Sequence, residues 1–137
     1  ETYSVNDQYR AENKDLLKAL LIAEIKGWTD VFKQPTDATV SLITKFYDEA
    51  AATGGGLEAE FGALDPKKTG IALDAELKLI STSETEANGL FTISDSLKKE
   101  TVASLAAAGW EVTVEELFDT TIIDEIYAEN PELKAYK

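Results

Sequence analysis

The longest helical pattern in the chain, residues 11–35, constrains the fold most. Large apolar side chains recur along it at steps of three and four residues: Leu17, Leu21, Ile25, Trp28 and Phe32. This period places them on one face of an α-helix, while most charged residues fall elsewhere. Asn13 is suited to cap the start, and Pro35 ends the helix because the residue before a proline is pushed out of the α region. The sequence predicts a helix with one broad apolar face.

Further amphipathic segments follow, separated by turn residues. We expect helices at about residues 36–52, 57–64, 72–80 and 95–108, and a last one that passes through Ile122 and Tyr127 and stops at Asn130-Pro131. Gly109 stands where a helix C-terminal glycine belongs, and Thr113 and Glu116 have the spacing of a capping box. Residues 65–70 resemble a turn, and residues 81–89 are polar enough for a surface loop.

These segments predict a mainly α fold with at most one or two short strands. The 137 residues, 44% of them hydrophobic, suffice for one domain with a core, so we expect residues 1–137 to form a single helical domain. Residues 1–9 are expected to form a short strand and a turn. Residues 131–137 are expected to be a frayed tail.

The net charge of −13 bounds the partners. Proteins that bind nucleic acid or anionic membrane surfaces usually carry an excess of Lys and Arg, so neither is expected as a partner. Solubility is the plain interpretation of this acidity. Steering of a cationic ligand is the alternative.

The chain contains no Cys and no His. Disulfides, thiol chemistry, His-based metal sites and Ser-His-Asp triads are therefore excluded, and we expect no catalytic residues, no metal and no cofactor. There is also no Met, so we expect a processed product or an excised part of a larger protein. No apolar run approaches the ~20 residues that cross a bilayer.

Acidic pairs and exposed aromatic residues are the remaining candidates for a site. Pairs such as Glu84 and Glu86 lack any signal that would set them across a cleft, so a solvated surface is their default interpretation. The triple glycine at 54–56 lacks the Lys-Ser/Thr ending of a phosphate loop. Trp28 lies on the core face of its helix. Phe91 and Trp110 flank a helix. Packing is the preferred interpretation for them and ligand contact the alternative, and they are stronger candidates for ligand contact than Trp28.

The order of these parts resembles a known family. Residues 5–38 resemble a C-terminal stretch of solute-binding proteins of the NMT1/THI5-like, sulfonate–nitrate–taurine class. The matching positions are Asp7, Tyr9, Ala11, Glu12, Asn13, Leu16, Leu17, Ala23, Gly27, Trp28, Pro35 and Ala38. Lys14 departs from the family's proline, which only favours the first helical turn. Gly89-Leu90-Phe91, residues 94–110 and residues 112–124 resemble the later glycine–aromatic turn, helix and closing segment.

The resemblance implies that the chain is the helix-rich C-terminal part of a two-lobed α/β fold like that of periplasmic binding proteins. Such a protein closes on a small solute outside the cytoplasmic membrane and delivers it to an ABC permease. The implied localisation is extracytoplasmic, either periplasmic or as a cell-surface lipoprotein. The implied solute contacts are Phe91 and Trp110, with Trp28 ranked below them.

A fragment of this kind would be separated from the strands that its helices cover. Exposed apolar faces would then favour self-association or a domain swap. The alternative interpretation is a stand-alone acidic helical module that serves in protein interaction or as a surface antigen. An enzyme is disfavoured because no nucleophile, base or acid pair is placed by the sequence.

Overall fold

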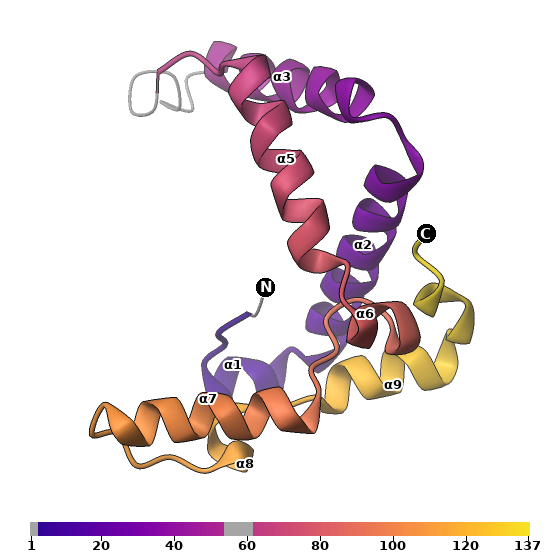
Figure 1. Ribbon diagram of the computed structural model, residues 1–137. Coiled ribbons are helices and arrows are strands. Elements are labelled where there is room, and N and C mark those ends of the chain that lie inside the picture. Colours follow the sequence, from indigo (N-terminus) through magenta and orange to yellow (C-terminus); the bar gives the residue numbers. More distant parts are fainter. Residues whose placement is uncertain (1–2, 54–61) are drawn as a thin grey trace.

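The computed structural model describes residues 3–53 and 62–137 (Figure 1). This part of the chain is mainly helical and contains no strand, which confirms the mainly α prediction. The elements are α1 (Asp7–Glu12), α2 (Lys14–Lys33), α3 (Thr36–Ala52), α5 (Pro66–Ile80), α6 (Ser83–Asn88), α7 (Asp95–Ala107), α8 (Val114–Leu117), α9 (Thr121–Glu129) and the 3₁₀ turn η1 (Pro131–Lys134). The triple glycine and most of the helix expected at 57–64 lie outside the described residues.

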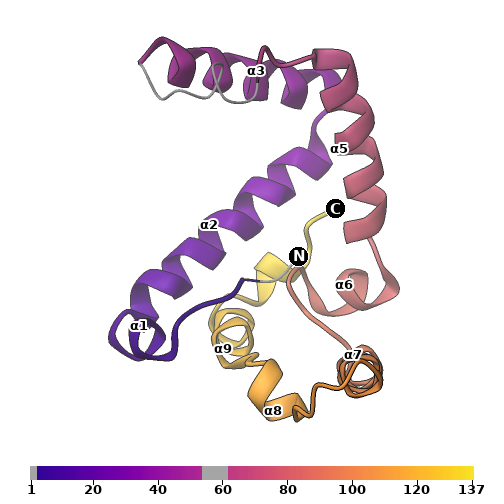
Figure 2. The same cartoon turned by 90° about the vertical axis from the view of Figure 1, so that its left-hand side faces the viewer.

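Helix α2 is the predicted central helix. Asn13 stands at its N-cap position but makes no side-chain capping hydrogen bond, and the helix ends at Lys33, before Pro35. Ile25 is fully buried, and Leu21, Trp28 and Phe32 pack around the core from the same face. Gln34 is the C-cap residue of α2, and the next residue, Pro35, is the N-cap residue of α3. The chain therefore turns sharply between the two long helices (Figure 2).

The N-terminal segment differs from the expected strand. Residues 3–6 have no regular secondary structure, and α1 begins at Asp7. Asn6 caps this helix because its side chain accepts hydrogen bonds from the backbone N–H groups of Gln8 and Tyr9. The Asn-Asp pair thus starts a helix here, where the sequence favoured a turn.

Two further segments are more helical than the sequence predicts. The expected turn at residues 65–70 is the start of α5, with Asp65 as its N-cap and Pro66 in its first turn. The expected polar loop contains α6, which begins with a capping box between Thr82 and Thr85. In both cases the side chain of the N-cap residue accepts hydrogen bonds from backbone N–H groups of the first helical turn. The polar composition alone suggested a loop.

The C-terminal helices follow the predicted caps. Gly109 has a φ of +89°, and the N–H groups of Gly109 and Trp110 donate to the carbonyls of Ala106 and Leu105, which is a Schellman motif. Thr113 and Glu116 form the predicted capping box at α8. Asn130 ends α9, as expected.

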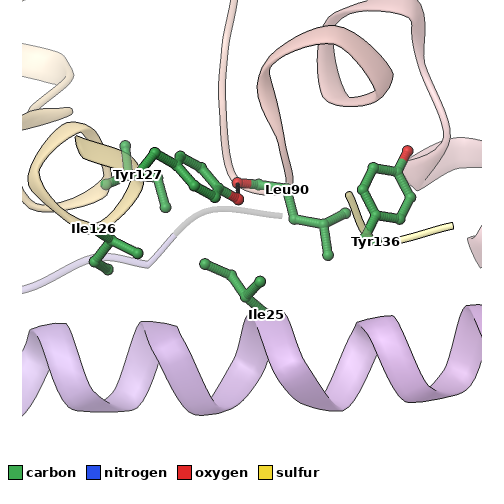
Figure 3. Close-up of a cluster of buried hydrophobic side chains, with 6 residues drawn as sticks. Ile25, Leu90, Ile126, Tyr127 and Tyr136 are labelled. Atoms are coloured by element: carbon green, nitrogen blue, oxygen red, sulfur yellow. Dashed lines mark hydrogen bonds between the residues drawn. The ribbon is translucent and has the colours of Figure 1, made fainter. Parts of the chain in front are cut away.

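The core forms where α2, α9, the turn at residues 89–91 and the C-terminal segment meet (Figure 3). Its buried members are Ile25, Leu90, Ile123, Ile126, Tyr127 and Tyr136. Ion pairs from Lys14 and Lys18 to Glu125 and from Lys18 to Glu129 join α2 to α9 beside it. The core therefore links residues from both ends of the chain.

The expectation of a frayed tail at residues 131–137 is wrong. Tyr136 is only 2% exposed, and its ring meets Phe32 edge to face with 4.8 Å between the ring centroids. The Tyr136 hydroxyl lies 3.1 Å from that of Thr85, and Lys137 pairs with Glu86. The free energy gained by burying the Tyr136 ring exceeds the conformational entropy lost when this short terminal segment becomes ordered.

Helices α3 and α5 pack on each other and extend away from this core (Figures 1 and 2). Val40 and Leu73 are buried on these two helices, and the Thr36 hydroxyl donates to Asp74 across them at 2.7 Å. Their other faces expose Leu42, Phe46, Ile71 and Leu79. Within the described residues no helix is long and apolar enough to span a membrane, and no sheet of a two-lobed α/β fold is present.

Candidate functional site

A hollow lies beside the core, lined by residues of α2, of the α5–α6 junction and of the segment that leads into α7. Its volume is about 200 Å³. It is lined by aromatic side chains (Trp28, Phe91), by aliphatic ones (Leu79, Ile80, Leu90, Ile93, Leu97) and by polar ones (Thr82, Glu84, Thr85, Thr92, Ser94). We call this hollow the Trp28–Phe91 pocket.

A tightly held turn forms one wall of the pocket. The buried Tyr127 hydroxyl donates to the Leu90 carbonyl at 2.8 Å, shown as a dashed line in Figure 3. Gly89 has a φ of +103°, and a Cβ there would lie 2.5 Å from the Tyr127 ring. Only glycine allows this approach. The turn is therefore fixed against α9 and sets the position of the next residue.

Phe91 takes an uncommon backbone conformation at the edge of this turn. Its φ is +63°, in the left-handed region that a bulky residue rarely adopts. The Phe91 ring lines the pocket and lies against Tyr3, with 6.0 Å between the ring centroids. A strained residue that the surrounding packing holds in place is a feature often found at binding sites.

Trp28, on α2, lines the same pocket. It stands on the inner face of this helix and is partly buried against the core. The structure thus brings together two of the sequence candidates, Trp28 and Phe91. Trp28 both packs against the core and lines the pocket. It is therefore compatible with core packing and with ligand contact.

Trp110, the remaining candidate, does not line this pocket. The Schellman turn at Gly109 ends α7 at its far end, and the Trp110 side chain is 68% exposed. Packing, one of the interpretations of Trp110 from the sequence, is not supported, because most of this residue is exposed.

The polar groups of the pocket were not predicted from the sequence. The Thr85 hydroxyl donates to the Ile80 carbonyl at 2.7 Å, and Ser94 accepts from the Leu97 N–H as the N-cap of α7. The Glu84 oxygen Oε1 accepts from Asn88 at 2.9 Å. The spacing of Thr82 and Thr85 in the sequence indicates a helix N-terminus. It does not indicate that this N-terminus lies beside Trp28, which depends on the tertiary fold.

A second hollow of about 340 Å³ adjoins the first and shares Glu84, Thr92 and Ile93 with it. Lys98 and Lys134 line it together with Asp124 and Tyr127. Burial raises the pKa of the Tyr127 hydroxyl from 10.0 to about 12, so this group stays protonated in its hydrogen bond to Leu90. Because two lysines and the acidic residues Glu84 and Asp124 line it, the second hollow carries charges of both signs.

The acidic pairs have structural roles. Hydrogen bonding from Lys137, and then from Ser81, lowers the pKa of Glu86. Glu116 closes its capping box and has a lowered pKa because it accepts from the Thr113 backbone. The hydrogen bond from Lys14 lowers the pKa of Glu125. Among the described residues, no cluster of three or more acidic side chains could hold a metal ion.

Comparisons with models of protein families, with curated proteins and with solved structures find no match for this chain. The pocket and the exposed apolar faces are therefore the structural indications of function, beside the resemblance in the sequence.

Proposed function

We propose that this chain is part of the solute-binding component of an ABC importer, and that its Trp28–Phe91 pocket contributes to non-covalent capture of a small solute. The observation that carries the proposal is the pocket itself: aromatic side chains from α2 and from a fixed glycine turn face one hollow beside the core. Aromatic walls with a few polar groups are typical of small-molecule sites.

The pocket offers groups that bind and orient but no arrangement for covalent chemistry. Its hydroxyls serve helix caps and backbone carbonyls, as Thr85 and Ser94 illustrate. Among the hydrogen bonds of the described residues, the Glu84 carboxylate accepts from Asn88 and not from a hydroxyl of the lining. In the intact receptor, binding would be coupled to hinge closure and to delivery of the solute to an ABC permease outside the cytoplasmic membrane.

The exposed apolar faces give independent support. Phe46 is 58% exposed on α3, and Ile71 and Leu79 are exposed on α5. In a two-lobed receptor, helices of this kind cover a central sheet, so such faces are expected when the sheet is missing. Contiguous exposed apolar surface is otherwise uncommon on a protein that works alone.

Tryptophan fluorescence tests solute capture, because the chain has two tryptophans in different settings. The variant Trp110→Phe retains only Trp28, which lines the pocket, and Trp28→Phe retains only the exposed Trp110. We expect a solute from a panel of sulfonates, pyrimidines and amines to change the emission of the first variant in a saturable way and to leave the second unchanged. A silent Trp28 across the whole panel would contradict the proposal.

The gene provides a second test of the importer role. We expect sequence for an α/β lobe and a secretion signal upstream of Glu1, and genes for a permease and an ATPase nearby. An unrelated domain fused upstream would refute this role while leaving solute capture open to the fluorescence test.

A stand-alone acidic interaction module is the second candidate. It is favoured by the same exposed residues on α3 and α5, which a protein partner could cover as well as a sheet could. The two functions differ at the pocket: an interaction module has no need of solute binding beside Trp28. Saturable fluorescence changes with a small molecule therefore favour the receptor, and binding to proteins alone favours the module.

A further inference from the structure

We propose that the Trp28–Phe91 pocket takes a small organic ammonium ion, held between the aromatic faces and the Glu84 carboxylate. This inference rests on the proposed function and adds the chemical class of the solute. It follows from the charges and side chains that line the hollow.

The lining carries one sign of charge. Glu84 is its single charged side chain, and no Lys or Arg occurs among the described residues that line it. Glu84 accepts a hydrogen bond from Asn88 through Oε1, and none of the ion pairs found in the described part of the chain includes Glu84. Its negative charge is therefore available to a ligand.

The walls suit a cation that also has apolar surface. Trp28 and Phe91 are both among the lining, and aromatic rings attract ammonium groups through the ring quadrupole, tryptophan most strongly. Leu90, Ile93 and Leu97 supply contacts for alkyl groups. A volume of about 200 Å³ is below the usual range for drug-sized ligands, so the solute is small.

Anions are disfavoured, although helix starts are near. The pocket is lined by the N-cap residues of α6 and α7, Thr82 and Ser94, and helix N-termini attract negative charge. Acidic residues already occupy these first turns: Glu84 and Glu86 in α6, and Asp95 in α7. The adjoining hollow shares Glu84 and is lined by two lysines: the Lys98 ammonium lies 3.4 Å from the Asp95 carboxylate, and that of Lys134 lies 5.7 Å from the centre of the Tyr127 ring.

The field of the whole chain acts in the same direction. A net charge of −13 raises the local concentration of cations and speeds their association. It lowers the local concentration of sulfonates and nitrate. The charge of the pocket thus differs from what an anion-binding member of the resembled class would need.

The test compares three probes of similar size on the Trp110→Phe chain: choline, its uncharged isostere with carbon in place of nitrogen, and ethanesulfonate. We expect choline to change Trp28 emission with a Kd about tenfold lower than that of the isostere, the scale of a partly desolvated cation–π contact. Ethanesulfonate should bind more weakly than either. Raising the salt concentration should weaken choline binding and leave the isostere unaffected.

Glu84→Gln is the decisive variant, because it removes the charge and keeps the shape. We expect it to lose most of the preference for choline over the isostere. Glu86→Gln is the matched control: it neutralises an acid on the same helix that pairs with Lys137 and does not line the pocket. The preference should survive in this control, and circular dichroism should show that both variants keep their helices.

The outcomes separate this inference from the function on which it rests. Equal binding of choline and its isostere, tighter binding of ethanesulfonate, or an unchanged preference in Glu84→Gln would overturn the ammonium assignment while solute capture stands. Absence of choline binding together with a response to another solute would also overturn the assignment alone. Silence of Trp28 toward every probe and toward the wider panel would overturn both.

Discussion

A side chain at Gly89 would collide with the Tyr127 ring, whereas Gly109 and Gly27 have free space around them. A Cβ at Gly89 would lie 2.5 Å from the ring, with φ at +103°. Gly109 also has a positive φ, but its Cβ would meet nothing within 4 Å. Gly27 lies inside α2 with open space around a Cβ.

Alanine at these positions should therefore have effects of different size and sign on the free energy of unfolding. We expect Gly89→Ala to cost about 3 kcal/mol or more, because strain and overlap act together. Gly109→Ala should cost about 1 kcal/mol. Gly27→Ala should stabilise by about 0.5–1 kcal/mol through helix propensity. Urea denaturation measures all of them, and equal costs at Gly89 and Gly109 would refute the close packing at Tyr127.

Tyr127 should make stability depend on pH in the alkaline range. Its pKa is about 12 in the folded chain against 10.0 for the free group, so the folded state binds more protons between these values. Its contribution is complete below pH 10 and is lost as the pH rises toward 12, a change of about 2–3 kcal/mol.

The variant Tyr127→Phe isolates this effect. It should cost about 1 kcal/mol at neutral pH, because the Leu90 carbonyl loses its donor. Lys18 and Lys137, whose pKa values are raised chiefly by hydrogen bonds to Glu129 and Glu86, remain in both chains. The difference in unfolding free energy between the two chains should therefore shrink above pH 10 and change sign as the pH approaches 12. A constant difference would show that Tyr127 is not desolvated.

At the scale of elements, the terminal segment has a larger role than its position suggests. Tyr136 fills a buried site against Phe32 and Thr85. We expect Tyr136→Ala to cost about 3–5 kcal/mol, as for other buried aromatic residues. Tyr136→Phe keeps the ring and should cost about 1 kcal/mol or less. Thermal unfolding distinguishes them, and a small cost for Tyr136→Ala would mean that the tail is not docked.

The helices were largely predictable because their signals are local. The period of α2, the proline after it, the glycine that ends α7 and the capping box at Thr113 all act within a few residues. The starts of α5 and α6 were missed because Asp65 and Thr82 are caps in polar surroundings that also suit loops. A short cap and a turn use the same residue types.

The site was only partly predictable because it is made of distant parts of the chain. Aromatic character singled out Trp28 and Phe91, but their meeting depends on the Tyr127 hydrogen bond to Leu90 and on the packing of α9 against α2. Trp110 has the same aromatic character and lies elsewhere. No local pattern predicted the docking of Tyr136 or the place of Glu84, since both depend on tertiary contacts.

At the scale of the whole molecule, the exposed faces of α3 and α5 should govern association. We expect light scattering to show an apparent mass that rises with protein concentration, because Leu42, Phe46, Ile71 and Leu79 expose apolar surface. Phe46→Glu should reduce this association. Ser41→Glu, which adds the same charge at another exposed position of α3, should reduce it less. A monomer at every concentration would contradict the proposed role of these faces.

The central claim is that a small solute binds beside Trp28 and Phe91, and NMR chemical shifts test it most directly. The two indole N–H signals report from inside and outside the pocket within one sample. Titration with the solute that changes Trp28 emission should shift the Trp28 indole and the amides of Phe91 and Thr92 along one saturable curve, while the Trp110 indole stays in place. Shifts that gather at Trp110, or that spread without saturation, would contradict the account.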